Sequence, residues 1–484
     1  MDRRKVIKGV VGVGALGIVG ALEAVYSKLP ESESCKKSLQ NFVLVIADDF
    51  SLRYDTQLVK TPEMTAFENE SIVFSNAYAA APSCSPSRAS MLTGVYPHRH
   101  GLVGLSRKDE WFKLKEEFIT RNLFAFFQER GYFTANLGKL HVEPWKSLGI
   151  DVRKKADMRD PAKIENAFRS VLSKNIAGKP IFLVVGLFDP HSVKNEFLNQ
   201  YKGLPEEVIR PEEVRPLSFQ MVDEPQQRER IAGYYNSIKR LDYQIGILMQ
   251  LLRSVGLYDS SAIVLTSDQG ASFTRSKTTL YEASIHVPMT LHLPGGCGGG
   301  TVVDSLVSHL DIAPTFLSLA GAGDSRLPGF GLMDIAAGRV KRKYVFSEAN
   351  YHFPCRYFPQ RSVRDERFKL IHNLAVGSIK YRTHPPTRSI DGDASFQMAM
   401  KDKYKGTVVE RIYSRQANPP EFELYDLAVD PDELDDLFGS EKLSEKREEL
   451  IGALRGWQEQ DDDPYRNGDF LKNDWKKYCG KERI

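Results

Sequence analysis

Residues 82–94, PSCSPSRASMLTG, place a thiol and a cation around a proline. Cys84 stands two residues before Pro86 and four before Arg88. Ser85 followed by Pro86 predicts a helix with Ser85 as its N-cap and Pro86 at the first helical position. Cys84 would then lie just outside the helix N-terminus, where backbone N–H groups and Arg88 form an anion site beside a potential nucleophile. The alternative is a small buried cysteine without a chemical role.

Two pairs of oxygen-bearing side chains follow two apolar runs. Asp48 and Asp49 end the run NFVLVIADD, and Asp268 and Gln269 follow SAIVLTS. Three carboxylates and an amide suit a hard divalent cation, calcium before magnesium, whereas zinc would more often bring imidazole or thiolate. Either pair alone could cap a helix or a turn. Two pairs at two strand ends favour a metal site.

Two further apolar runs also end in polar residues. GYFTANLGKLH contains Lys139 and His141, and PIFLVVGLFDPH ends in Asp189 and His191. Continuous apolar runs of this kind predict central strands that are covered on both faces. In parallel sheets, ligands bind beyond the carboxyl ends of the strands. We therefore expect all four segments to deliver their reactive groups to one edge of one sheet.

Helical patterns alternate with these strands. The segments 121–130 and 229–256 are helical in pattern, with glycine at the end of each, so the chain predicts an α/β fold with a largely parallel sheet. After about residue 345, short strands mix with loops and lead into a last helix. We expect a catalytic domain at 39–345 and a smaller α+β domain at 346–484 that completes the substrate pocket.

The stretch CSPSR followed by ASMLTG resembles the Cys-x-Pro-x-Arg signature of type I sulfatases. The resemblance implies an alkaline-phosphatase-like sandwich with a large, mostly parallel central sheet flanked by helices. It also implies that a formylglycine-generating enzyme oxidises Cys84 to 3-oxoalanine (formylglycine). One hydroxyl of the hydrated aldehyde would attack sulfur, and the second would help to expel sulfate. A plain alkoxide would instead leave a stable sulfate ester.

The same resemblance implies roles for the other polar residues. It implies one Ca²⁺, with Mg²⁺ less favoured, and the ligand positions Asp48, Asp49, Cys84, Asp268 and Gln269. Gln269 departs from the more usual asparagine or histidine but keeps an amide oxygen. The other catalytic positions are Arg88, which supports formylglycine; Lys139 and His141, which contact the sulfate and the nucleophile; His191, which binds sulfate or protonates the leaving group; and Lys277, the second sulfate-binding lysine.

A finer resemblance, to the heparan N-sulfatase (sulfamidase) branch, covers most of the chain. It rests on APSCSPSRAS, FDPHS, RSVRDERFKLIHNL, FELYDLAVDPDELDDL and GWQEQDDDPY. It implies an N-sulfoglucosamine substrate. We expect His352 and Arg356, in NYHFPCRYFPQRSVR, to contact the sugar from the second domain, with a surface loop as the alternative. However, that branch has an arginine where this chain has Lys277. An O-sulfatase acting on an algal or host polysaccharide, a phosphonate or phosphodiester hydrolase, and a non-enzymatic glycan binder with unmodified Cys84 all stay open.

Composition and the N-terminus limit the cellular context. A formal net charge of +3 in 484 residues argues against a dedicated nucleic-acid binder. Five cysteines without paired spacing do not resemble a disulfide framework. Arg3 and Arg4 precede a glycine-rich apolar run at 9–22, which resembles a twin-arginine export signal. We expect 1–38 to be signal and linker, and the protein to use the twin-arginine translocation machinery to reach the periplasm, cell surface or exterior of a prokaryote.

Overall fold

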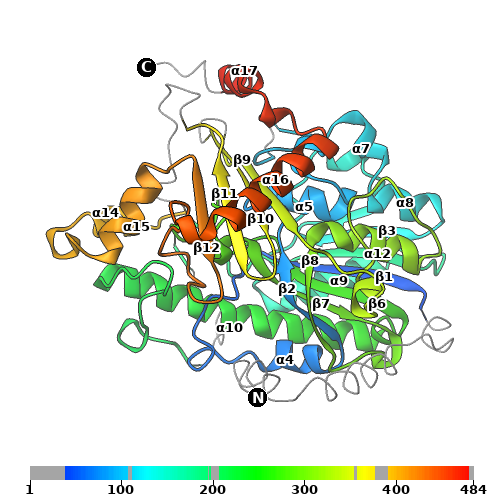
Figure 1. Cartoon of the computed structure of the whole chain (residues 1–484). Helices are drawn as coiled ribbons and strands as arrows, with labels where there is room; N and C mark the ends of the chain where they lie inside the picture. Colours follow the sequence, from blue (N-terminus) through cyan, green and yellow to red (C-terminus); the bar gives the residue numbers. More distant parts are fainter. Residues whose placement is uncertain are drawn as a thin grey trace, which may run out of the picture.

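The structure, a computed structural model, describes residues 39–106, 112–194, 196–197, 207–353, 357–376 and 391–478. At its centre lies an eight-stranded sheet of order β4-β3-β5-β1-β6-β7-β2-β8 (Figure 1). Its strands are β1 (Asn41–Ala47), β2 (Ile72–Tyr78), β3 (Phe133–Gly138), β4 (Val152–Lys154), β5 (Ile181–Gly186), β6 (Ser261–Ser267), β7 (His286–His292) and β8 (Val302–Ser308).

The four apolar runs of the sequence form four adjacent parallel strands, β3, β5, β1 and β6. Val45 of β1 pairs with Val185 of β5 on one side and with Leu265 of β6 on the other. All seven residues of β1 are buried. The prediction of central parallel strands is therefore confirmed, and the carboxyl ends of all four strands meet at one edge.

Helices cover both faces of this sheet, which explains why the strands are apolar at every position. Phe42, Leu44 and Ile46 belong to one hydrophobic core, and Val43 and Val45 belong to the core on the opposite face. The helices over the first core include α5 (Cys84–Thr93), α8 (Leu123–Glu129) and α12 (Ile312–Leu319). Those over the second include α4 (Pro62–Asn69), α9 (Pro161–Leu172) and α10 (Pro225–Ser254). Shorter helices are α6 (Pro97–His100), α7 (Glu116–Thr120), α11 (Glu282–Ile285) and α13 (Leu332–Ala336).

The helix that carries Cys84 starts earlier than the sequence predicted. Ser83, not Ser85, is the N-cap of α5, and Cys84 is the first helical residue. The Ser83 carbonyl accepts a hydrogen bond from the Ser87 N–H at 3.0 Å. Proline lacks an N–H, but the N–H groups of the whole first turn have no partner inside a helix, so Pro86 is tolerated at the third position. Cys84 is consequently held by helical backbone.

A second, antiparallel sheet of order β12-β11-β10-β9 follows in the chain. Its strands are β9 (Val345–Tyr351), β10 (Tyr357–Arg364), β11 (Phe368–Asn373) and β12 (Phe422–Asp426). Val363, Leu370 and Leu424 of this sheet pack against Leu450 and Leu454 of α16 (Ser444–Gln460), which lies across the sheet in Figure 1. The other C-terminal helices are α14 (Ser395–Ala399), α15 (Val408–Ala417) and α17 (Gly468–Tyr478). The smaller α+β part is confirmed, and its boundary at residue 345 stays a prediction.

Two features concern the cysteines and the membrane. Cys297 takes part in a disulfide, which the scattered cysteine spacing did not indicate because separation along the chain does not report separation in space.

The predicted signal at 1–38 lies outside the described residues. Within the part of the chain that the structure describes, no helix combines the length and the apolar character needed to cross a membrane.

His98 joins α6 to the C-terminal part through buried polar contacts. Its Nδ1 lies 2.5 Å from Glu348 Oε2 of β9, and its Nε2 lies 3.1 Å from Asp461 Oδ2, directly after α16. Burial alone would lower the pKa of His98, but the Glu348 charge and hydrogen bonds to Asp461 and Glu348 outweigh it and raise the pKa to about 10. The imidazolium therefore helps to hold the two parts together.

We expect the stabilisation by His98 to depend on pH. The folded chain keeps this proton up to about pH 10, whereas the unfolded chain releases it near 6.5. The contribution is therefore complete below pH 6.5 and is lost as the pH rises toward 10. Urea unfolding should give His98→Gln a deficit on the order of a few kcal/mol at about pH 6 that shrinks by about pH 9.5. A deficit that does not change with pH would mean that packing alone explains the role of His98.

Candidate active site

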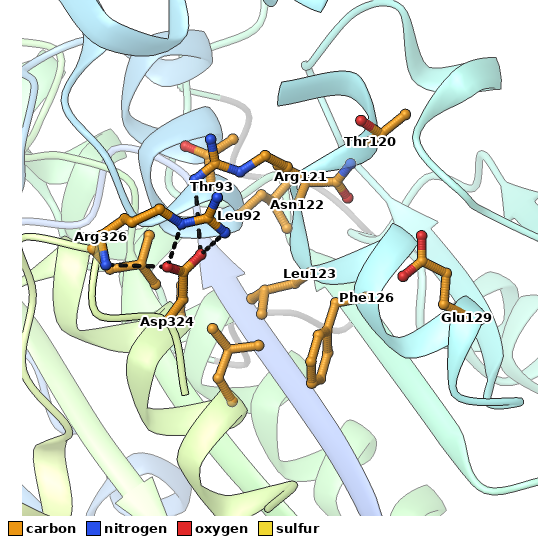
Figure 2. A pocket seen from close by; sticks show the side chains of 13 residues that line it. Leu92, Thr93, Thr120, Arg121, Asn122, Leu123, Phe126, Glu129, Asp324 and Arg326 are labelled. Atoms are coloured by element: carbon orange, nitrogen blue, oxygen red, sulfur yellow. Dashed lines mark hydrogen bonds and ion pairs between the residues drawn. The ribbon is translucent and has the colours of Figure 1, made fainter. Parts of the chain in front are cut away.

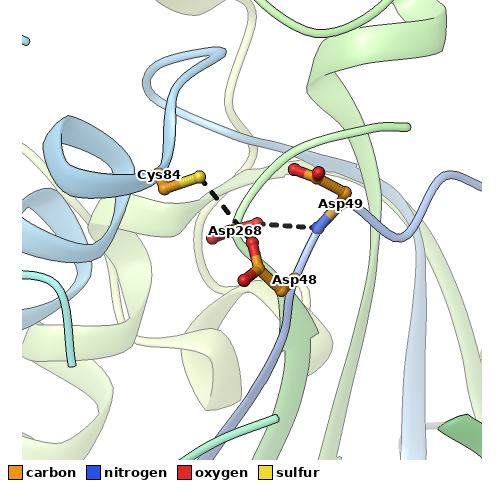
Figure 3. A group of neighbouring side chains, drawn as sticks. All are labelled: Asp48, Asp49, Cys84 and Asp268. Atoms are coloured by element: carbon orange, nitrogen blue, oxygen red, sulfur yellow. Dashed lines mark hydrogen bonds between the residues drawn. The ribbon is translucent and has the colours of Figure 1, made fainter. Parts of the chain in front are cut away.

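Three carboxylates and the thiol meet at the carboxyl edge of the large sheet. Asp48 and Asp49 follow β1, and Asp268 follows β6. Figure 3 shows Cys84 at the start of α5 with its sulfur toward these aspartates. One ligand atom from each of the four lies within 4.8 Å of the others, and all four residues are buried. The convergence expected from the strand pattern is thus observed.

The donor set fits a hard divalent cation. Gln269 donates a hydrogen bond through Nε2 to Asp49 Oδ1, while its Oε1 is buried without a hydrogen-bond partner. Burial and the charge of Asp48 raise the pKa of Asp268, so the carboxylates repel one another in the absence of further positive charge. Three crowded carboxylates suit an oxygen-coordinated divalent ion, and the Gln269 amide could add its unpartnered oxygen by turning about its terminal bond.

Two cations, Arg88 and Lys139, contact Asp268 and Asp48 of this cluster. Arg88 Nε donates to Asp268 Oδ2 at 2.8 Å, and its Nη1 donates to the Lys139 carbonyl at 3.1 Å. Lys139 Nζ lies 2.5 Å from Asp48 Oδ2. Arg88 Nη2 is buried without a hydrogen-bond partner, so it has a donor left for an anionic ligand. Burial opposes ionisation of Asp48, but Lys139, His191 and Arg88 together hold its pKa well below the usual value.

Lys277 and His191 both contact Asp49. His191 Nδ1 is 2.5 Å and Lys277 Nζ is 2.9 Å from Asp49 Oδ2. Lys277 Nζ also donates to Asp391 Oδ2 at 2.8 Å. Sequence reasoning missed Asp391, since it lies in a polar loop, DGDAS, whose composition is typical of any turn.

His141 and Asp189 have different surroundings. Burial and the nearby Lys139 charge hold the pKa of His141 well below its usual value, so its imidazole is neutral. Asp189 accepts hydrogen bonds from Arg159, Arg240 and Gln244. Since Arg159 Nη2 also donates to the His191 carbonyl at 2.9 Å, Asp189 anchors the loop that carries His191.

Of the two residues predicted to contact a sugar, only His352 lies in the described part of the chain. His352 is buried, with 4% of its surface exposed, and its Nδ1 lies 2.9 Å from Ser83 Oγ at the N-cap of α5. It therefore supports the segment that presents Cys84, and its contact with a sugar stays a prediction. Arg356 lies outside the described residues.

The Cys84 thiol is a poor nucleophile as it stands. Its Sγ is 3.7 Å from Asp48 Oδ1 and 3.3 Å from Gln269 Nε2. Burial raises the pKa of the thiol far above its usual value, despite the opposing charges of Lys139 and Lys277. A thiolate, which is the reactive form, is therefore scarce near neutral pH.

A separate cavity of about 220 Å³ lies at the opposite end of α5 (Figure 2). Leu92 and Thr93 line it together with Phe126 of α8. Asp324 and Arg326 also line it and form an ion pair. None of the candidate active-site residues lines this cavity.

Gly186, the last residue of β5, permits the close approach of the Lys139 backbone. A Cβ at this position would lie 1.8 Å from the Lys139 carbonyl oxygen and 3.0 Å from Arg88 Nη1. We expect Gly186→Ala to lower the free energy of unfolding by about 1–3 kcal/mol, because the backbone must shift. Gly452→Ala is the control, since its Cβ meets nothing within 4 Å inside α16 and should stabilise by about 0.5–1 kcal/mol. Equal urea midpoints for the two variants would contradict the close approach.

Comparisons with known proteins agree with this geometry. Residues 40–322 match the family model for sulfatases, and residues 273–379 match the model for the C-terminal region of N-sulphoglucosamine sulphohydrolase. The human N-sulphoglucosamine sulphohydrolase is 26% identical over 89% of this chain and 92% of its own length. An ulvan-active sulfatase of Formosa agariphila is 25% identical over 90% of this chain and 82% of its own.

A solved structure supports the same fold. An enzyme described in complex with its substrate D-glucosamine-2-N,6-O-disulfate superposes with a TM-score of 0.62 at 19% identity. The match covers 88% of this chain and 99% of that one. Together with the mixed sheet flanked by helices on both faces, this identifies the alkaline-phosphatase-like fold.

Proposed function

The chain belongs to the sulfatase family, and we propose that it is an exported, calcium-dependent sulfohydrolase that acts on a sulfated glycan, with N-sulfoglucosamine of heparan-type chains as its substrate. The single observation that carries the proposal is the meeting of Cys84 with three carboxylates at one strand edge, with ligand atoms within 4.8 Å of each other. Arg88, Lys139 and Lys277 surround this cluster with positive charge.

The cofactors of the proposed reaction are one Ca²⁺ and 3-oxoalanine at position 84. Asp48, Asp49, Asp268, the Gln269 amide oxygen and the converted residue 84 would hold the ion. Once formed and hydrated, 3-oxoalanine supplies a hydroxyl nucleophile, and the ion supplies positive charge for that oxygen and the sulfo group. The poor nucleophilicity of the buried thiol supports this modification, because Cys84 itself has little reactivity to offer.

The side chains around the cluster would bind the sulfo group and transfer protons. Arg88 has a buried Nη2 donor without a partner and, with Lys139 and Lys277, holds the sulfo oxygens. The neutral His141 imidazole beside Lys139 donates or accepts a hydrogen bond at the nucleophile. His191, held by Asp49 through Nδ1, gives a proton to the leaving atom. A nitrogen leaving group needs that proton more than a phenolate does.

Two observations support an N-sulfo substrate over an O-sulfo substrate. The chain matches the C-terminal model of N-sulphoglucosamine sulphohydrolase, and the human enzyme of that name aligns over most of both chains. Lys277, which stands where the sulfamidase branch has arginine, weighs against it. An O-sulfatase acting on another polysaccharide is the second candidate, favoured by the similar ulvan-active sulfatase. A phosphonate or phosphodiester hydrolase and a non-catalytic glycan binder are the remaining alternatives.

Export is part of the proposal. The twin arginine at Arg3 and Arg4 ahead of an apolar run supports passage through the twin-arginine machinery, which carries folded proteins. Conversion of Cys84 and loading of the ion inside the cell are compatible with that route. The periplasm, the cell surface or the exterior is the proposed location.

We expect the peptide containing Cys84, from protein purified from its own host, to have the mass of 3-oxoalanine at position 84. The same protein should release sulfate from N-sulfoglucosamine. Cys84→Ala should lower kcat by at least about 10³-fold while the chain stays folded, because the nucleophile is lost. Mass spectrometry and sulfate release measure the two effects.

A panel of sulfated sugars separates the substrate hypotheses. Sulfate release from O-sulfated sugars alone would exclude the N-sulfo assignment. Release of phosphate or phosphonate without release of sulfate would favour the phosphoryl alternative. Unmodified Cys84, in a host whose other sulfatases are converted, would contradict the formylglycine mechanism and favour a binder.

We also expect the divalent ion to stabilise the fold. Removal with EGTA leaves the mutual repulsion of Asp48, Asp49 and Asp268 only partly offset by Arg88, Lys139 and Lys277, so the unfolding midpoint should fall. Readdition of Ca²⁺ at about 100 times its Kd should restore about 3 kcal/mol. Differential scanning calorimetry measures the midpoint. Equal restoration by Mg²⁺ at the same concentration would count against calcium as the preferred ion.

A further inference from the structure

A fourth carboxylate lies beside the cations of the proposed sulfo-binding site. Asp391 Oδ2 is 2.8 Å from Lys277 Nζ, and the same ammonium is 2.9 Å from Asp49 Oδ2. Lys277 is almost fully buried, with 1% of its side chain exposed, while Asp391 keeps 22%. Burial opposes the ionisation of Asp391, but Lys277 and His191 together hold its pKa well below the usual value. Asp391 is therefore a carboxylate at neutral pH.

The loop that carries Asp391 is anchored to the rest of the site. The Asp391 carbonyl accepts a hydrogen bond from Arg230 Nη2 of α10 at 2.9 Å. Two residues later, Asp393 Oδ2 accepts from the Thr274 N–H at 2.5 Å and from Gln220 Nε2 at 3.0 Å. Thr274 lies three residues before Lys277, so the loop and the lysine are held on one support. The charge of Asp391 is thus a fixed part of the site.

The charges of the described site are close to balance. Three cations (Arg88, Lys139 and Lys277) face four carboxylates (Asp48, Asp49, Asp268 and Asp391). With a divalent ion bound, the ion and these seven side chains sum to one positive charge, before any charge on His191 is counted. A sulfate ester or sulfamate carries one negative charge, whereas a phosphate monoester carries two above its second pKa of about 6. Asp391 lowers the net positive charge of the site by one whatever the protonation state of His191, so it disfavours the second negative charge of a phosphoryl group more than the single charge of a sulfo group.

We propose that Asp391 is a specificity residue that makes the site prefer a singly charged sulfo group over a doubly charged phosphoryl group. This inference rests on the proposed function, since it assumes that the sulfo group binds at Lys277. An anion that pairs with Lys277 is separated from the Asp391 carboxylate by the ammonium group to which both bind. At such a distance, about 5 Å, repulsion of one extra charge corresponds to about 10- to 100-fold in affinity.

Asp391 could instead serve only to position Lys277, and two variants separate the roles. Asp391→Asn keeps an oxygen that accepts the Lys277 hydrogen bond but removes the charge. Asp391→Glu keeps the charge on a longer side chain. A matched control for net charge is Asp402→Asn, because Asp402 is 91% exposed and pairs only with Lys405 among the ion pairs of the described residues.

The experiment compares two probes of similar shape, benzenesulfonate with one negative charge and phenylphosphonate with two. Isothermal titration calorimetry of the full-length, calcium-loaded protein at about pH 8.5 gives the ratio of their Kd values. In Asp391→Asn we expect this ratio to move toward phenylphosphonate by about 10- to 100-fold. In Asp391→Glu and Asp402→Asn it should stay within about threefold of wild type.

Each other outcome has a distinct meaning. Equal weakening of both probes in Asp391→Asn would make Asp391 a support for Lys277 and would overturn the inference. An unchanged ratio in Asp391→Asn would overturn it as well. A wild-type protein that binds neither probe and releases no sulfate from any sulfated sugar, despite 3-oxoalanine at position 84, would overturn the proposed function itself.

Discussion

The site depends on one electrostatic constraint, which is that several negative charges are buried together at the end of a sheet. Carboxylates that lie so close repel one another, and their burial removes the water that would screen them. Buried cations reduce this repulsion because they contact the carboxylates directly, as Arg88 contacts Asp268 and Lys277 contacts Asp49. Such an arrangement is costly without a ligand. The proposed divalent ion and anionic substrate would offset this cost.

The parallel sheet is what makes this concentration of charge possible. Four neighbouring strands end at one edge, so polar residues from distant parts of the sequence meet without a long loop. The apolar strand residues on both faces fill two separate cores, which fix the strand ends in place. The smaller sheet contacts the start of α5, since His352, which directly follows β9, lies 2.9 Å through Nδ1 from Ser83 Oγ at the N-cap.

Much of this arrangement could be predicted from the sequence, and the exceptions have physical reasons. Runs such as NFVLVIA are buried on both faces, so their continuous apolar character predicts a strand. The polar residues that follow these runs mark the candidate site. The start of α5 was predicted too late, because proline is compatible with more than one position in the first helical turn. Asp391 was missed because its role depends on a tertiary contact with Lys277, and no local pattern reports such a contact.

The carboxylates of the cluster come from residues that are far apart in the sequence. In this respect the cluster differs from sites that are built on a single sequence motif. The Asp49 N–H bonds to Asp268 Oδ1 across 219 positions, so the ligand set does not exist until strands β1 and β6 have paired. Closing so long a loop costs chain entropy that only the packed sheet recovers. Affinity for the proposed ion would then require the paired strands β1 and β6, so retention of that ion would report that this part of the sheet has formed.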